Sequence, residues 1–380
     1  MTYKLKRYNK ILLGLVTALV VIGAIIVLSA SSMYSLEKSN NFATLFNHHL
    51  RIIIFGIGTF VVGMIFPYQF YQKITKWLLL GAVIALLATF AFGTTVKGAS
   101  RWLDLGFVKF QPSEAAKIIL IVHISYMIYR LGDRIAEFKH GLLYPLIWIG
   151  VTAFLIMIQP NMSTAFIVAF VGMTMLFVGG ARVKHIAAVS IVGLLFVVAM
   201  MWAYPHSRAR IVSYFNSHGV AEKINDQVYQ ARIGLGSGGL TGVGLGESSQ
   251  ANLFVSESYG DFIFSILGEE LGFAGTLFVT TLYLMLFFVS LLQMKNIRDK
   301  FGQMLIFGLS FNIVLTAFIN IAVVLGIFPT TGITLPFISY GGTSIAMFAL
   351  SVGIIINVTA EGRVLKLRKR LVRISEFFGD

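Results

Sequence analysis

A single acidic residue, Asp261, stands at the start of a long uncharged stretch and is the side chain best placed to do chemistry. It belongs to the sequence YGDFIFSILGEELGFAG, and the apolar run that follows, 271–292, is long enough to cross a hydrocarbon core of about 30 Å. A carboxylate in this position can accept a proton as a general base. At helical spacing Ser265, Gly268 and Gly272 share its face, so an acidic N-cap above a small-residue packing face is the alternative interpretation.

A second polar stretch, KGASRWLDLGFVKFQPSEAAK, covers residues 97–117 between two apolar segments. Arg101 can bind a phosphate through its guanidinium group. Trp102 can either stack on a sugar or anchor the chain at the membrane interface. Pro112 and Ser113 are residues that begin a helix. The stretch therefore places an anion-binding side chain and an aromatic side chain just before a predicted helix.

Lys117 lies about one turn inside that predicted helix, where an unpaired cation is costly. Glu114 shares its helix face at i, i+3. Glu269 and Glu270 are acids of the segment that follows Asp261. We expect Lys117 to pair with one of these three carboxylates or with a bound anion, and the sequence leaves the choice open.

Two further segments are rich in glycine and low in charge. The first, GLGSGGLTGVGLGE at 234–247, contains the spacing GxGxxG, but no strand and crossover helix surround it, which argues against a dinucleotide site. Tight turns or a close approach of the backbone to a ligand explain it better, with plain flexibility as the alternative. The second, PTTGITLPFISYGGTS at 329–344, is typical of a re-entrant segment that is buried in protein or lines a cavity.

The sequence contains no metal-ligating pattern. His48 and His49 are adjacent, and His123 lies inside an apolar segment, so we predict no zinc site. A divalent cation, Mg²⁺ or Mn²⁺, could still be shared between a carboxylate and a phosphorylated substrate. The chain has no cysteine, which excludes thiol catalysis, disulfides and iron–sulfur clusters.

The composition places these residues in a polytopic membrane protein. Hydrophobic residues make up 57% of the chain and charged residues 12%, which excludes an ordinary soluble domain. The apolar runs are continuous and do not alternate as barrel strands do, so we predict an all-α fold. The ten predicted spans are 11–31, 50–66, 77–93, 113–131, 142–158, 161–180, 183–203, 261–292, 302–327 and 342–360.

The distribution of lysine and arginine predicts the orientation of these spans. With both termini in the cytoplasm, the cytoplasmic side carries the whole net charge of +14 and the external side is neutral. The basic excess then faces an anionic inner leaflet and is no argument for nucleic-acid binding.

This topology predicts one ten-helix transmembrane domain over residues 1–361. It contains a long extracytoplasmic loop, 204–260, between the seventh and eighth spans, and a loop of this length suggests a function. Residues 362–380 form a basic cytoplasmic tail with an apolar stripe, which we expect to lie on the inner leaflet. The charged N-terminus precedes an apolar run long enough to remain as an uncleaved first span.

Four motifs, in this order, resemble the SEDS family of membrane proteins, which includes RodA and FtsW. They are GASRWLDLG…QPSEAAK, GLGSGGLTGVGLGESSQ, DFIFSILGEELGFAG and PTTGITLPFISYGGTS, and the resemblance covers essentially the whole chain. GVGLGES and the complete last motif are more similar to FtsW, the division member, than to RodA, the elongation member. The resemblance implies a peptidoglycan glycosyltransferase that polymerises lipid II in the bacterial cytoplasmic (inner) membrane, at the division septum. It also implies a class B penicillin-binding protein transpeptidase and other division proteins as partners.

By the same resemblance, Asp261 matches the family's essential aspartate and Trp102 matches a functionally important tryptophan. Two departures put other roles in doubt: Tyr259 and Gly260 stand where many members have HTDFIF, and QPNMST at 159–164 stands where many have QPDLGT. The residues that we expect to bind substrate are Arg101, Trp102, Gln111, Ser113, Glu114, Lys117, Glu269, Ser339 and Tyr340.

The implied reaction needs one base. Asp261 would accept the proton of a sugar hydroxyl that displaces the undecaprenyl pyrophosphate of lipid II, with inversion at the anomeric carbon. Arg101, Lys117 or a divalent ion would stabilise the departing pyrophosphate. The alternatives are a lipid II flippase or other transporter, and a structural scaffold for division proteins. The position of Asp261 outside the apolar run favours the enzyme, because a translocation path should carry ionisable residues near the middle of the membrane.

Overall fold

The computed structural model describes residues 2–96, 99–104, 106, 109–203, 208, 212, 223–253 and 259–377. Within these residues, ten helices are long and apolar enough to cross a membrane, which confirms the predicted number of spans and the all-α class. They are α1 (Thr2–Ser39), α2 (Thr44–Ile65), α3 (Tyr68–Phe92), α4 (Pro112–Leu131), α5 (Leu143–Ile158), α6 (Met162–Gly179), α7 (Val183–Ala203), α11 (Ile263–Met294), α12 (Lys300–Val324) and α13 (Gly342–Phe377).

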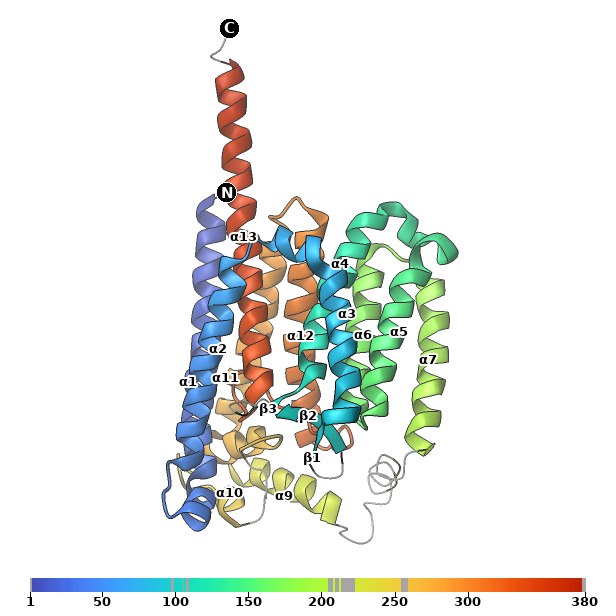
Figure 1. Ribbon diagram of the computed structural model, residues 1–380. Helices are drawn as coiled ribbons and strands as arrows, with labels where there is room; N and C mark the ends of the chain where they lie inside the picture. Colours follow the sequence, from blue (N-terminus) through green and yellow to red (C-terminus); the bar gives the residue numbers. More distant parts are fainter. Residues whose placement is uncertain are drawn as a thin grey trace.

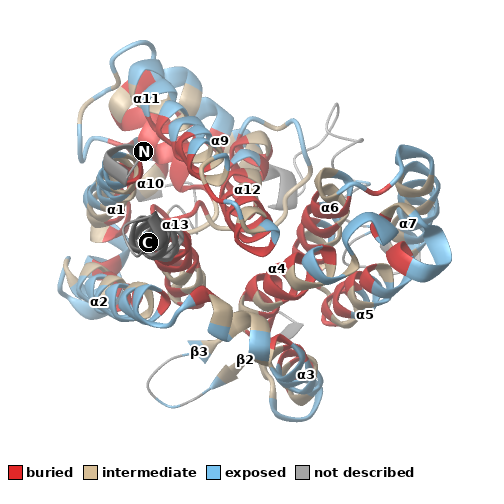
Figure 2. Cartoon of the chain, turned by 90° about the horizontal axis from the view of Figure 1, so that it is seen from above, coloured by how far each residue is buried: buried red, intermediate tan, exposed pale blue. Residues whose placement is uncertain are grey.

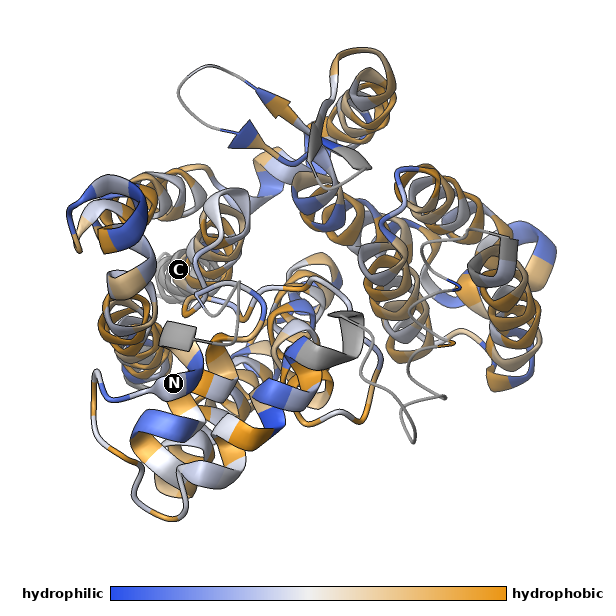
Figure 3. Ribbon diagram, turned by 90° about the horizontal axis from the view of Figure 1, so that it is seen from below, coloured by the Kyte–Doolittle hydropathy of each residue, from blue (hydrophilic) through white to orange (hydrophobic). Residues whose placement is uncertain are grey.

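The helices form one bundle with α12 and α4 at its centre (Figures 1 and 2). The apolar window of α12 is 78% buried, whereas that of α7, which packs on α6 at the periphery, is 0% buried. Large apolar side chains such as Ile65, Trp77 and Phe92 are exposed on the outside of the bundle. Figure 3 shows that hydrophobic residues predominate along the spanning helices, as expected for segments that cross a membrane.

Small residues allow two of these helices to pack closely. Gly63 of α2 and Gly353 of α13 meet so tightly that a Cβ on Gly63 would lie 2.7 Å from the carbonyl oxygen of Leu350, and one on Gly353 would overlap the carbonyl of Phe60. Contacts of this kind bring helix backbones together without an apolar driving force between helices. They hold α13, and the segment that precedes it, in a fixed position.

The sequence did not predict the small three-stranded antiparallel sheet between α3 and α4. Its strands are β1 (Thr94–Val96), β2 (Ala99–Asp104) and β3 (Lys109–Phe110), in the order β1-β2-β3. The register pairs Thr94 with Trp102, and Leu103 with Phe110. Strands this short show no apolar alternation that a sequence pattern could detect.

The predicted loop 204–260 contains two helices in its described part, α9 (Lys223–Ser237) and α10 (Ser249–Leu253). Residues 204–207, 209–211, 213–222 and 254–258 of this predicted loop lie outside the described residues. Both α9 and α10 lie at the end of the bundle that also carries the sheet (Figure 1), and α9 packs against α11 and α12.

Helix α11 is broken at Gly272, whose φ is 66°. The carbonyl groups of Glu269 and Glu270 accept hydrogen bonds from Val243 N at 2.9 Å and Gly244 N at 3.1 Å. On the other side of the break, the backbone N–H groups of residues 273 and 274 donate to the carbonyls of residues 239 and 240 at 2.9 and 3.1 Å. The glycine-rich segment therefore supplies the hydrogen bonds that the broken helix lacks. Non-helical backbone inside a membrane domain needs such partners from the protein itself.

The opposite end of the bundle carries the start of α1 and most of the short basic links. Between α4 and α5 lie η1 (Gly132–Ala136), a 3₁₀ turn, and η2 (Phe138–Leu142), a π-helical turn. Helix α13 continues to Phe377, beyond the predicted span end at 360, so the predicted tail of 362–380 extends this helix in its described part. Figure 1 shows η1 and η2 at the same end as the start of α1.

Candidate active site

Asp261 lies two residues before the first residue of α11, at the end of the bundle that carries the sheet and α9. The N-cap of α11 is Phe262, so the acidic N-cap interpretation does not hold. The side chain of Asn320, near the end of α12, donates to the carbonyl oxygens of Asp261 and Ile333, each at 2.7 Å. One buried amide therefore connects the residue that precedes α11 to the segment that precedes α13.

The carboxylate of Asp261 lies beside the backbone of Gly332. A Cβ built on Gly332 would be 3.5 Å from Asp261 Oδ2, and Gly332 has a φ of 72°, which favours glycine. The carbonyl oxygen of the preceding residue, Thr331, accepts a hydrogen bond from Ser163 Oγ at 3.1 Å, so the start of α6 reaches the same place. Asp261 is half-buried, which leaves its carboxylate partly accessible at this end of the bundle.

The small-residue face that the sequence placed below Asp261 is not an open groove. A Cβ on Gly268 would overlap the side chain of Leu235 in α9. Gly272 is not helical, and a Cβ there would overlap the backbone of Leu240. The glycine-rich segment covers this face because glycine lets the two backbones touch. The close backbone approach predicted for the glycine-rich segment is thus an approach to another part of this chain, the start of α11.

The segment 329–341 is non-helical and largely buried, as expected for a re-entrant segment. Tyr283 donates from its hydroxyl to the carbonyl of Pro336, and Ser339 Oγ accepts from Leu335 N at 2.7 Å. A Cβ on Gly23 of α1 would lie 2.6 Å from the Cα of Ile338. These contacts satisfy backbone groups that the absence of a helix would leave unpaired.

Ser339 and Tyr340, both expected to bind substrate, belong to this segment. The backbone N–H of Tyr340 donates to the carbonyl of Tyr259 at 2.9 Å, which places Tyr340 next to the segment that leads to Asp261. Its hydroxyl lies 2.8 Å from His48 Nδ1, and its ring meets that of Tyr259 edge-on at 5.6 Å. Burial raises the pKa of Tyr340, so its hydroxyl keeps its proton at neutral pH. Ser339 is buried and bonded within the segment, as described above.

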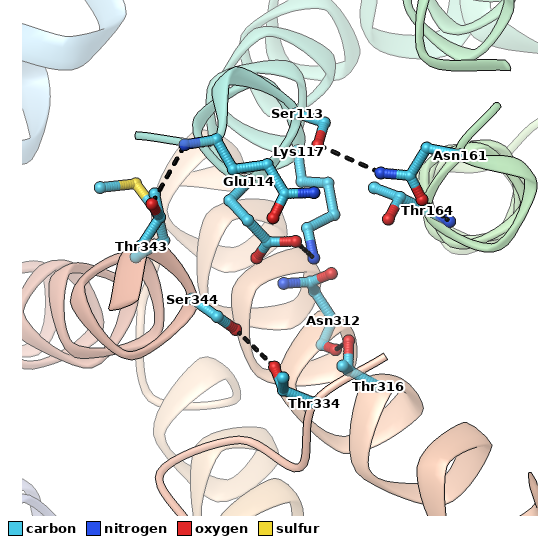
Figure 4. A network of polar contacts seen from close by, with 12 residues as sticks. Ser113, Glu114, Lys117, Asn161, Thr164, Asn312, Thr316, Thr334, Thr343 and Ser344 are labelled. Atoms are coloured by element: carbon cyan, nitrogen blue, oxygen red, sulfur yellow. Dashed lines mark hydrogen bonds and ion pairs between the residues drawn. The ribbon is translucent and has the colours of Figure 1, made fainter. Parts of the chain in front are cut away.

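Lys117 pairs with Glu114: its Nζ lies 2.9 Å from Glu114 Oε1. Both residues are buried, at 4% and 7% exposure. Lys117 also lies over the ring of Phe348 at 5.5 Å from its centre, and lines a cavity of about 10 Å³ together with Asn312 of α12. Figure 4 shows Lys117 pointing toward Asn312 across the space between α4 and α12. Of the partners open to Lys117 in the sequence, the structure selects Glu114.

Glu269 and Glu270 instead hold the end of the glycine-rich segment. Glu269 accepts hydrogen bonds from the Ser248 hydroxyl, from Ser249 N at 3.1 Å and from Gln250 N at 3.3 Å, at the start of α10. Glu270 accepts from the Ser29 hydroxyl and from Gly246 N at 3.1 Å. The contacts of Glu269 are therefore to the protein, and its expected part in substrate binding stays a prediction.

Gln111 and Ser113 lie at the start of α4, where α6 and α13 also begin. Gln111 N donates to Thr343 Oγ1 at 3.1 Å. The buried hydroxyl of Ser113 lies 3.5 Å from Asn161 Nδ2, and Asn161 caps α6 by accepting from Thr164 N at 3.4 Å (Figure 4). Asn161 is the position at which QPNMST departs from the pattern QPDLGT named in the sequence analysis, and asparagine or aspartate can cap a helix in this way.

Arg101 and Trp102 are brought to this end by strand β2. The guanidinium of Arg101 donates from Nε to the carbonyl of Gln159 at 3.0 Å and from Nη2 to the carbonyl of Pro160. These bonds tie the sheet to the link between α5 and α6. Trp102 is half-buried, and its carbonyl accepts from Thr94 Oγ1 at 3.2 Å. A phosphate contact by Arg101 and a sugar contact by Trp102 stay predictions.

The polar side of α12 is the main part of the site that the sequence analysis missed. Asn312, Thr316 and Asn320 recur every four residues, share one face and are buried. Polar residues at helical spacing inside an apolar span mark a functional or packing surface. This repeat is visible in the sequence and was the signal that could have located the polar side of α12.

The described residues hold no group of three His, Asp or Glu side chains that could bind a metal ion. The possible Mg²⁺ or Mn²⁺ stays a prediction, because such an ion can be held by substrate phosphates and only one or two carboxylates. The arrangement offers one partly accessible carboxylate beside hydroxyls, amides and aromatic rings. Chemically, this suits proton transfer from a polar, hydroxyl-rich ligand.

Comparison with known proteins identifies relatives along the whole chain. A family model described as cell cycle protein, covering FtsW, RodA and SpoVE, matches residues 9–364. A probable peptidoglycan glycosyltransferase FtsW of Geobacter sp. (strain M18) is 34% identical over 363 residues, which cover 95% of this chain and 99% of that protein. A protein of the same name from Escherichia coli O6:H1 is 33% identical over 374 residues, covering 96% and 89%.

Solved structures share the fold. A chain from a study of how a peptidoglycan synthase complex coordinates polymerization and crosslinking superposes with a TM-score of 0.77 at 22% identity, covering 92% of this chain and 97% of that one. The rod shape determining protein RodA of Thermus thermophilus superposes with a TM-score of 0.69 at 23% identity, covering 92% and 96%.

Proposed function

The chain belongs to the FtsW, RodA and SpoVE family of cell cycle proteins, and from that membership we propose that it is a peptidoglycan glycosyltransferase that polymerises lipid II during cell division. The observation that carries the proposal is the position of Asp261. It stands outside α11 and is half-buried at the end of the bundle opposite the basic links; its backbone carbonyl is held by Asn320 and its carboxylate lies beside Gly332. The curated relatives with matching chain length are named for this activity.

In the proposed reaction, a sugar hydroxyl of one glycan attacks the anomeric carbon of another. The C–O bond to the undecaprenyl pyrophosphate breaks, the hydroxyl proton moves to the Asp261 carboxylate, and the pyrophosphate leaves with the bonding electrons. A single carboxylate suffices for such an inverting displacement, and a general base contributes about 10² to 10⁴ in rate. Two residues before Asp261, the ring of Tyr259 meets that of Tyr340, and these aromatic rings suit contacts with sugar faces.

The charge of the leaving pyrophosphate needs a positive partner. Arg101 already binds the carbonyls of Gln159 and Pro160, and Lys117 is paired with Glu114. These two cations are thus partly engaged within the protein. A divalent ion carried by the pyrophosphate would supply the remaining positive charge.

The proposal includes the cellular setting. Ten spans put the start of α1 and the end of α13 at the same end of the bundle, and the net charge of +14 favours the cytoplasm for that end. Asp261 then faces outward, where lipid II is consumed in the bacterial cytoplasmic membrane and at the division septum. A class B penicillin-binding protein is the proposed partner, supported by the fold shared with a chain from the study of a synthase complex.

Incubation of the purified protein with lipid II, with and without that partner, tests the activity. Wild type should form glycan polymer, and Asp261→Asn should lower the rate by at least about 10²-fold because an amide cannot accept the proton. Asp104→Asn is the matched control, since Asp104 is an exposed carboxylate on β2 whose Oδ1 accepts from Gly106 N at 2.9 Å, a bond that asparagine can keep. It should retain full activity.

Three outcomes would count against the proposal. Appreciable polymer from Asp261→Asn would remove the general-base role. No polymer from wild type with its partner, together with lipid II flipping in proteoliposomes, would favour the transporter. If wild type showed neither polymerisation nor flipping but still bound its partner, the scaffold would be favoured.

The absence of cysteine makes the orientation easy to test. Asn41→Cys lies in the link between α1 and α2, and Lys295→Cys lies in the link between α11 and α12; both positions are exposed. An impermeant thiol reagent should label the first in intact spheroplasts and the second only after the membrane is opened. The reverse pattern would place Asp261 in the cytoplasm and overturn the mechanism.

A further inference from the structure

A cavity of about 520 Å³ opens between α3, α4 and α5 at the end of the bundle opposite Asp261. On α4 the lining residues begin at His123 and reach Arg130, so along the helix the cavity starts about 9 Å from Lys117 and its basic rim at Arg130 lies about 20 Å from it. Its volume falls in the range of about 300–1,000 Å³ that is usual for small-molecule sites. The cavity is therefore a second site, remote from the proposed reaction.

Basic side chains from four different elements line this cavity. Lys76 comes from α3, Arg130 from α4, Arg134 from η1 and His140 from η2. Their convergence is produced by the fold, because Lys76 is separated from the others by the whole sheet and most of α4.

Within the part of the chain that the structure describes, no carboxylate lies within 4.0 Å of Lys76, Arg130 or Arg134. The nearby ion pair of α4, between Lys117 and Glu114, uses neither arginine. Asp133 and Glu137 belong to the same link as Arg134, yet neither lines the cavity. Positive groups that face one concave site without an acid raise the local concentration of anions.

The inner part of the cavity is aromatic and apolar. His123 and Trp148 meet edge-on at 5.9 Å, and Thr75 Oγ1 lies 3.3 Å from His123 Nδ1, which fixes the ring. Leu79, also buried, lines the same wall. A site with cations at its rim and apolar groups inside suits an amphiphile better than a free inorganic anion.

The surface beside the opening is apolar as well. Trp77 and Leu80, next to two lining residues on α3, are 75% and 49% exposed, and Ile147, next to Trp148 on α5, is 48% exposed. Exposed apolar side chains on membrane-spanning helices face lipid, and tryptophan is favoured at the level of the head groups. The helices that line the cavity therefore also present apolar side chains to lipid.

We propose that this cavity binds the phosphate head group of an anionic phospholipid from the leaflet at that end of the bundle. Lys76, Arg130 and Arg134 would hold the phosphate, with the glycerol and upper acyl chain against Trp148 and Leu79. Basic pockets between spans on the cytoplasmic side are suited to such head groups. This site is independent of the proposed polymerase chemistry.

Native mass spectrometry of the full-length protein, titrated with phosphatidylglycerol or phosphatidylcholine, tests the proposal. Wild type should bind phosphatidylglycerol in preference to phosphatidylcholine. Arg130→Gln/Arg134→Gln should weaken phosphatidylglycerol binding by about thirtyfold, because each lost arginine removes a charge-assisted contact with the phosphate. It should weaken phosphatidylcholine binding much less, because the choline group offsets the phosphate charge. Arg182→Gln/Lys184→Gln is the matched control, because these residues lie at the same end, are exposed and do not line the cavity.

The control should change phosphatidylglycerol binding by no more than about twofold, since a contribution through the general surface charge is small. Equal losses in both double variants, or no loss in the cavity variant, would overturn the proposal. If the cavity variant does not fold, Lys76→Gln/His140→Gln provides the same test from the flanking elements. Inorganic phosphate, at ionic strength matched with chloride, should not displace the lipid; displacement by phosphate and not by chloride would make a soluble phosphate the ligand and refute the lipid.

Discussion

Asn320 donates from its side-chain amide to the backbone carbonyl of Asp261 at 2.7 Å, and with its second N–H to the carbonyl of Ile333 at the same distance. Both donors of this buried amide are therefore used to join two non-helical segments that are far apart in the sequence. The position of Asp261 depends on this bridge, because the residue stands outside the hydrogen-bonded part of α11.

Asn320→Leu should lower both stability and activity. It leaves two carbonyl groups without their donor, which costs about 1–3 kcal/mol for each group that stays buried and unpaired. We expect a lower Tm in detergent and a lower kcat for lipid II polymerisation with a smaller change in KM, since Asp261 would lose its support.

The matched control for this variant is Asn312→Leu, on the same helix and equally buried. The side-chain amide of Asn312 has no hydrogen-bond partner, so a residue of similar shape should be neutral or stabilising. Equal losses of Tm in the two variants would show that the bridge to Asp261 has no special importance.

The Glu114–Lys117 pair should be strongly coupled. Lys117→Met leaves a buried carboxylate without its partner, which costs about 3–5 kcal/mol, and Glu114→Gln leaves the ammonium group unpaired at similar cost. The double variant should lose clearly less stability than the sum of the two, as measured by the Tm of singles and doubles.

Glu269→Gln serves as the comparison, because Glu269 binds residues 248–250 and not Lys117. Its effect should add to that of Lys117→Met. If the stability losses of Lys117→Met and Glu114→Gln were also strictly additive, Lys117 would not be stabilised by this pair and would act on another group.

The break in α11 should require glycine. Gly272→Ala places a Cβ at a φ of 66°, where it would overlap the backbone of Leu240, so it should cost about 1–3 kcal/mol from strained backbone alone. Gly193→Ala in α7 has open space around its Cβ and should stabilise the helix by about 0.5–1 kcal/mol. Thermal unfolding of both variants decides the matter, and a Gly272→Ala protein as stable as wild type would show that the break is not needed.

Tyr340 should make the stability sensitive to alkaline pH. Burial raises its pKa in the folded protein, so the folded state holds the proton more tightly than the unfolded state does. Its contribution is complete below the ordinary tyrosine pKa of about 10 and is lost as pH rises from there through the folded pKa. The Tm of wild type should therefore fall more steeply above this pH than that of Tyr340→Phe, and parallel curves would contradict the assignment.

The sequence by itself determined the ten spans, the charge bias and the prominence of Asp261. These features are local: a continuous apolar run must be helical in a membrane, and a charge next to it is visible without knowing what it touches. The repeat of Asn312, Thr316 and Asn320 was visible in the same way, and reading it at helical spacing would have located the polar side of α12.

The tertiary structure alone decided the partners of these residues. Lys117 could have met three acids, and the packing of α4 left only Glu114 beside it, while Glu269 and Glu270 turned to the segment before α10. The glycine-rich segment covers the break at Gly272, because the hydrogen-bond donors and acceptors that the broken helix lacks had to come from another part of the chain. Contacts across such separations depend on how helices pack, which residue type and spacing do not specify.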